Sequence, residues 1–144
     1  MYLSEYQKAR QQGLKEVKLC QSRGGTPYPP VLDEILREEE TCGEVRLELT
    51  EIPLELIVGT RSAGRSRAFS RSFHPLMEED SEFAYKWITL CQAQMEEGIH
   101  DPIQAYEYMH TFYVVEGHKR VSVLRYFGAV SISAEITRVL PAKD

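Results

Sequence analysis

The order of apolar segments and glycines across residues 112–139 constrains the fold more than any other feature of this sequence. Residues 112–115 form a compact apolar run that is typical of a buried strand, and residues 131–139 alternate between apolar and polar side chains. Between these two strands, residues 119–127 have helical spacing and stand between Gly117 and Gly128. A strand, a short turn, a helix and a further strand predict a helix packed against a sheet.

Other segments add helices and strands to this unit. Apolar residues recur every three or four positions over residues 3–21, and Asp80 or Ser81 precedes a second run of that kind, which ends at Gly98. The further expected elements are helices over 3–21, 31–40 (with a fraying acidic end) and 81–97, and strands over 45–49, 54–58 and 103–108, with residues 51–53 as an interruption. This order predicts an α+β fold, with the helices over 81–97 and 119–127 packed on a small mixed sheet.

Residues 1–42 are expected to form an N-terminal helical arm, and residues 43–144 the main domain. Pro27, Pro29 and Pro30 enforce an extended link after the first helix. The apolar stripe of the arm must be covered either by its own domain or by a second subunit, so a homo-oligomer is one expectation. Deleting residues 1–42 should leave a folded unit.

Composition argues against several classes of protein. No run in the 144 residues approaches the roughly 18 apolar residues of a membrane span, and the polar start lacks a signal-peptide core. The three cysteines are odd in number and widely spaced, which argues against a disulfide framework and for a cytoplasmic setting. The histidines at 74, 100 and 110 show no ligand spacing, so we expect no metal centre. The net charge of −5 disfavours nonspecific nucleic-acid binding by the whole chain.

Residues 59–73, the basic segment, contain four arginines and no acid. One interpretation is a solvated surface loop. A second is a phosphate clamp, in which the planar guanidinium groups of Arg61 and Arg65 hold an anion. A third is a short contact with nucleic acid such as DNA, which is poorly supported because Phe69 is the one aromatic residue before the closing Phe73.

The turn at Gly117 is the second candidate for an anion site. Free N–H groups at a helix N-terminus favour a phosphate, and a glycine lets the backbone approach it closely. Lys119 and Arg120 stand in the first helical turn, where the helix dipole disfavours cations unless an anion is present. The alternative is a plain turn between a strand and a helix with both cations solvated.

Residues 112–137, FYVVEGHKRVSVLRYFGAVSISAEIT, resemble the signature of the ParB/sulfiredoxin-like superfamily. That signature is an apolar strand, Gly-Glu-Arg-Arg, a helix ending in Leu-Gly, and a strand. Gly117 matches its glycine, Lys119 and Arg120 match its basic positions, and His118 replaces its acid. Upstream, EIPLELIVG and DPIQAYEY resemble two further strands of the family, so the resemblance covers roughly residues 50–140.

The resemblance implies a compact α+β unit that holds nucleotide phosphates at the N-terminus of the motif helix. It implies a nucleoside triphosphate, with Mg²⁺, as the ligand. The expected phosphate-binding residues are Gly59, Thr60, Arg61, Arg65, Gly117, His118, Lys119 and Arg120. No cysteine lies near the turn, so the sulfinic-acid reduction of sulfiredoxins is not expected. The chain ends soon after the last strand, so the helix-turn-helix domain of partition proteins is not expected in it either.

Three hypotheses for function follow. The first is a regulatory domain that binds phosphate or nucleotide. The second is an enzyme on the same fold, a phosphotransferase or nuclease, with Glu116 as the catalytic base or a Mg²⁺ ligand. For Glu116 the simpler alternative is an ion pair with Lys119 or Arg120. The third is a protein-interaction domain with a non-functional pocket.

Overall fold

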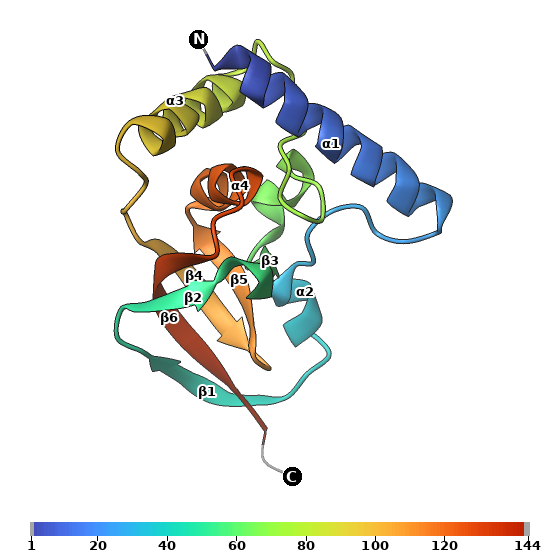
Figure 1. Cartoon of the computed structure of the whole chain (residues 1–144). Coiled ribbons are helices and arrows are strands. Elements are labelled where there is room, and N and C mark those ends of the chain that lie inside the picture. Colours follow the sequence, from blue (N-terminus) through green and yellow to red (C-terminus); the bar gives the residue numbers. More distant parts are fainter. Residues whose placement is uncertain (1, 143–144) are drawn as a thin grey trace.

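The computed structural model of the chain describes residues 2–142 (Figure 1). The elements follow in the order α1 (Leu3–Ser22), α2 (Leu32–Leu36), β1 (Thr41–Arg46), β2 (Thr50–Pro53), the 3-10 helix η1 (Leu54–Leu56), β3 (Ile57–Thr60), the 3-10 helix η2 (Ala63–Ala68), α3 (Glu82–Glu96), β4 (Ile103–Tyr108), β5 (Thr111–Glu116), α4 (His118–Tyr126) and β6 (Ser131–Pro141). Within the described range, no helix is both long and apolar enough to cross a membrane.

All six strands belong to one mixed sheet, which confirms the predicted α+β fold. The strand order is β1-β6-β4-β5-β3, and β2 pairs with β6 beyond the end of β1. The pairs β4–β6 and β3–β5 are parallel, whereas β1–β6, β2–β6 and β4–β5 are antiparallel. The long strand β6 therefore joins the central β4 to both short strands at one edge.

Local signals account for the elements that were predicted correctly. The Ser81 hydroxyl accepts a hydrogen bond from the Ala84 N–H at 3.1 Å, which caps the start of α3, and Gly98 follows its end with a φ of 84°. Met109 and His110 form the hairpin between β4 and β5, with φ values of 52° and 69°. These contacts lie within a few residues of one another, so the sequence reveals them.

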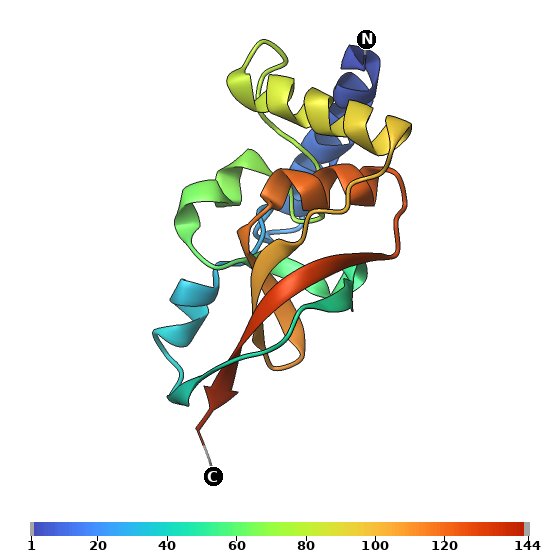
Figure 2. The ribbon, with the colours of Figure 1, turned by 90° about the vertical axis from the view of Figure 1, so that its left-hand side faces the viewer.

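The helices α4, α3 and α1 stack in layers above one face of the sheet (Figures 1 and 2). Val121 and Leu124 of α4 belong to the main apolar cluster with the sheet, whereas Val123 belongs to a second cluster with α1 and α3. The Trp87 indole N–H donates to the Ser122 hydroxyl at 2.9 Å across the α3–α4 interface. We expected the helix over residues 81–97 to pack on the sheet, and this expectation is wrong. The helix α3 packs mainly on α4, which is buried on both sides and separates α3 from the strands.

The region before η1 differs from the expected half-buried strand over residues 45–49. All six residues of β1 are exposed, and β1 spans residues 41–46 at the edge of the sheet. Residues 51–53, the expected interruption, belong to β2 and pair with β6. Ile52 is the buried residue there, and Pro53 is tolerated because it ends an edge strand.

The N-terminal arm packs against its own chain. Tyr6 and Ala9 of α1 are fully buried, and the Tyr6 ring meets the Trp87 ring edge-on at 5.3 Å between centres. Beyond α1, Leu32 of α2 is buried with Tyr113 in a third cluster, which also includes residues of β4 and β6. The apolar stripe of the arm is therefore covered without a second subunit at these positions.

Candidate functional site

A groove of about 510 Å³ lies where η2, α3, the end of β5 and the start of α4 meet. Its lining carries four cationic side chains, one carboxylate and an exposed aromatic ring. The lining residues are Arg65, Tyr85, Lys86, Thr89, Leu90, Glu116, Gly117, Lys119 and Arg120. The structure thus brings together Arg65, Glu116 and the turn at Gly117, which the sequence places about 50 positions apart.

Packing against Ile103 explains why a glycine with a positive φ stands at the turn before α4. Gly117 is the N-cap of α4 with a φ of 106°, and an added Cβ would lie 2.5 Å from Ile103 Cγ2. No side chain caps α4, and its first turn holds no acid. The first N–H groups of α4 have no acceptor within the helix, so water or a ligand must satisfy them.

Lys119 and Lys86 bring positive charge to the groove from facing helices. Lys119 Nζ lies 5.0 Å from the centre of the Phe83 ring. Burial, followed by repulsion from Arg65 and Lys86, lowers the pKa of Lys119, and Glu82 opposes this change. Lys86 forms an exposed ion pair with Glu82 at 3.0 Å. Burial and the two neighbouring cations thus act together to favour the neutral amine of Lys119, and Glu82 only partly offsets them.

Arg120 and Arg65 differ in how firmly they are held. Arg120 Nη1 donates a hydrogen bond of 2.7 Å to the Pro102 carbonyl, which anchors the guanidinium beside the turn. Arg65 is exposed on η2. Arg120 is thus held in place by the Pro102 carbonyl, whereas Arg65 reaches the groove from the exposed side of the 3-10 helix η2.

His118 and Thr60 are buried and do not line this groove. The His118 side chain is 4% exposed, its Nε2 lies 2.7 Å from the Thr60 hydroxyl, and its ring stacks on Phe69. Burial, together with the charges of Arg65 and Lys119, lowers the pKa of His118 to about 4. His118 is therefore neutral at pH 7 and ties the start of α4 to β3.

Gly59 and Arg61, two other predicted phosphate-binding residues, lie away from the groove. An added Cβ at Gly59 would collide with the Pro30 carbonyl and the Tyr113 ring, so this glycine allows β3 to meet the arm. The Arg61 guanidinium stacks over the Tyr106 ring at 4.3 Å and lines a separate pocket of about 180 Å³. Since side chains alternate along a strand, Tyr106 lies on the sheet face opposite the one that α4 covers.

The groove also contains side chains that the sequence analysis did not single out as functional. Tyr85, Lys86, Thr89 and Leu90 all come from α3. Lys86 looks like an ordinary solvated cation in the sequence. Its proximity to the start of α4 depends on the packing of α3 on α4, so no local motif could reveal it.

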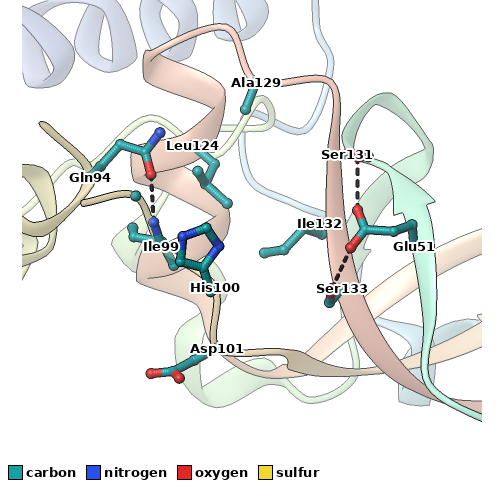
Figure 3. Close-up of a pocket in the computed structure, with 11 residues that line it drawn as sticks. Glu51, Gln94, Ile99, His100, Asp101, Leu124, Ala129, Ser131, Ile132 and Ser133 are labelled. Atoms are coloured by element: carbon teal, nitrogen blue, oxygen red, sulfur yellow. Dashed lines mark hydrogen bonds between the residues drawn. The ribbon is translucent and has the colours of Figure 1, made fainter.

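A further pocket, of about 290 Å³, lies between the end of α3 and the starts of β2 and β6 (Figure 3). The Glu51 carboxylate there accepts hydrogen bonds from Ser133 and Ser131, which lower its pKa. On the other side, the Gln94 amide oxygen accepts from the Ile99 N–H at 2.8 Å. Across residues 2–142, no group of three or more His, Cys, Asp or Glu side chains is placed to hold a metal ion.

Comparison with known proteins gives a weak likeness to a solved structure. No protein-family model matches the sequence, and no curated protein matches it. The chain is similar to the crystal structure of sulfiredoxin from Arabidopsis thaliana, with 24% sequence identity and a TM-score of 0.43. The match covers 62% of this chain and 84% of that chain. The assignment of a ligand rests on the side chains of this chain.

Proposed function

We propose that the groove binds the phosphate groups of a nucleotide or of another phosphate-bearing ligand. The observation that carries this proposal is the gathering of Arg65, Lys86 and the pair Lys119–Arg120 around the uncapped N-terminus of α4. These residues come from three separate elements, so they are brought together by the fold and not by a run of basic sequence. Uncapped N–H groups and guanidinium forks are the donors that phosphate oxygens accept from.

The electrostatics of the groove favour a polyanion. The whole chain carries a net charge of −5, yet Glu116 is the one carboxylate in a lining with four cations. A bound di- or triphosphate would relieve the repulsion from Arg65 and Lys86, which adds to the effect of burial in lowering the pKa of Lys119. The repulsion among these cations is reduced only when an anion is bound, so its reduction adds to the affinity for an anion.

The apolar part of the lining suits the rest of a nucleotide. Tyr85 is 65% exposed, although it is a large aromatic side chain, and both Tyr85 and Leu90 line the groove. Any of the nucleotide bases can stack on an exposed aromatic ring, because each base has a flat π-face. Tyr85 therefore supports a nucleotide over inorganic phosphate as the ligand.

Glu116 supports a second, catalytic candidate on the same site. Its carboxylate lines the groove and makes no ion pair within residues 2–142. It could supply one oxygen ligand to a Mg²⁺ ion that the phosphates hold, or accept a proton in phosphoryl transfer. We keep phosphotransfer or nuclease activity as the alternative, and a cytoplasmic setting as part of the proposal, since all three cysteines are free.

Calorimetric titration with pyrophosphate, ATP, CTP and GTP, with and without Mg²⁺, tests the proposal. Arg65→Ala should weaken binding by about tenfold or more, as for the loss of a charge-assisted hydrogen bond. Arg120→Ala should weaken it similarly.

Arg61→Ala is the matched control, because it removes an arginine from the same basic segment but outside the groove. It should leave the affinity within about twofold, apart from long-range charge effects. Wild-type protein that binds none of these anions at millimolar concentration would contradict the proposal and leave the interaction-domain hypothesis in its place. Equal losses in the Arg61 and Arg65 variants would also contradict it.

A further inference from the structure

The N-terminal arm runs alongside the chain that carries the basic segment. Figure 1 shows the green segment between η2 and α3 lying beneath α1. The contacts follow an antiparallel order, because lower residue numbers in the arm meet higher numbers in the segment. The pairs, from first to last, are Asp33 with Arg61, Tyr28 with Arg67, Thr26 with Arg71, Glu16 with Ser72, Arg10 with Leu76 and Tyr6 with Met77.

Glu16 makes the central contact of this series. Its carboxylate accepts hydrogen bonds from both the backbone N–H of Ser72, at 3.1 Å, and the Ser72 hydroxyl, at 2.5 Å. Burial acts to raise the pKa of Glu16, but hydrogen bonds from Ser70 and Ser72 together outweigh it and lower the pKa. The ionised carboxylate therefore fixes the turn that begins at Ser70.

Contacts on both sides of η2 anchor the rest of the basic segment. At its start, the Thr60 N–H donates to the Pro30 carbonyl and the Asp33 N–H donates to the Arg61 carbonyl. At its end, Arg71 Nη1 donates to the Thr26 carbonyl at 3.1 Å. Between these anchors, η2 presents Arg65 to the groove.

We infer that Glu16 is a positioning residue for the anion groove: through Ser72 it orders the basic segment so that Arg65 is in place before a phosphate binds. This inference rests on the proposed function for its ligand. An ordered loop loses less conformational entropy on binding than a mobile one, so the arm raises the affinity of a site that it does not line. A substitution in the arm, far from the groove, would therefore alter the affinity of the groove for an anion.

Hydrogen exchange measured by mass spectrometry tests the positioning without any ligand. In Glu16→Ala, exchange of the peptide over residues 61–76 should rise by about tenfold, whereas that over 103–116 in the sheet should not change. Ser72→Ala should raise the exchange rate of the same peptide. In the double variant of Glu16 and Ser72, the rate should rise by less than the product of the two single increases. Glu48→Ala, which removes an exposed carboxylate elsewhere, is the charge-matched control.

Titration of the same variants with pyrophosphate tests the link to the groove. Simple electrostatics predicts that removing a carboxylate strengthens anion binding, whereas the loss of positioning predicts about tenfold weaker binding in Glu16→Ala. Unchanged exchange over residues 61–76 would overturn the inference, and so would faster exchange with unchanged or tighter binding. Faster exchange in a protein whose wild type binds no anion would sustain the positioning by Glu16 and overturn the proposed function instead.

Discussion

His118 is a predicted phosphate-binding residue that the fold instead buries as an internal support. Its imidazole hydrogen-bonds the Thr60 hydroxyl at 2.7 Å, and Thr60 also lies within 3.3 Å of the Val114 carbonyl. A buried hydrogen bond of this kind links the first residue of α4 to β3 and β5. The same burial excludes the imidazolium form, because a charge would lose its hydration there.

This burial predicts that the stability of the protein depends on pH through His118. The pKa of His118 is about 4 in the folded protein and 6.5 when unperturbed, so the unfolded state binds more protons between these values. The stabilising contribution is present above pH 6.5 and is lost as the pH falls toward 4, by roughly 3 kcal/mol at most. Urea unfolding of the wild type between pH 7 and 4 measures the loss.

The comparison variant is His118→Gln, which does not titrate. His74, with a pKa also lowered by burial, and the carboxylates with lowered pKa values contribute equally to both proteins. The free energy of unfolding should therefore fall less steeply with acid in the variant. The same slope in both proteins would rule out a neutral, buried His118.

The connection between β5 and α4 is the element on which the groove depends. Gly117 ends the strand and caps the helix in one residue, so the two elements meet at a tight angle. Ile103 of β4 fills the space where a side chain at Gly117 would lie. The position of the helix N-terminus therefore follows from packing within the chain.

Gly117→Ala should destabilise the protein by about 2–4 kcal/mol, because it adds both a strained positive φ and a collision with Ile103. Thermal or urea unfolding checks the size of the loss. Gly64→Ala is the matched control, since nothing lies within 4 Å of the added Cβ. If Gly117→Ala keeps wild-type stability yet loses anion binding, close backbone approach of the ligand explains the glycine better than packing does.

On the scale of the whole molecule, each of the three apolar clusters joins a different set of layers. The cluster between the sheet and α4 draws its buried residues from positions 52–136, with none from the arm. The arm supplies Tyr6 and Ala9 to the cluster around Trp87, and Leu32 to the cluster on the other sheet face. The main core is therefore complete without residues 1–42.

Deleting residues 1–42 should leave a folded but less stable protein. The deletion uncovers Trp87 and Tyr113, and each large apolar side chain lost from a cluster costs roughly 1.5–3 kcal/mol. Far-UV circular dichroism should keep its mixed α/β character, while the melting temperature falls. Trp87, the single tryptophan, should show red-shifted fluorescence. A spectrum of an unfolded chain would contradict the domain boundary at residue 42.

The sequence by itself determined the elements whose signals are local. The cap at Ser81, the stop at Gly98, the hairpin at Met109–His110 and the strand–glycine–helix unit at Gly117 follow from neighbours a few residues apart. These signals suffice because capping, turn geometry and apolar periodicity involve one element at a time. They predicted the mixed α+β fold and half of the candidate site.

Only the tertiary structure decided which side chains share the groove. Arg61 and Arg65 stand four positions apart in one basic segment, yet they line separate pockets. Lys86 comes to face Lys119 because α3 packs on α4 and not on the sheet. Both outcomes depend on how apolar faces far apart in the chain are buried against each other, a long-range balance of packing that local spacing does not encode.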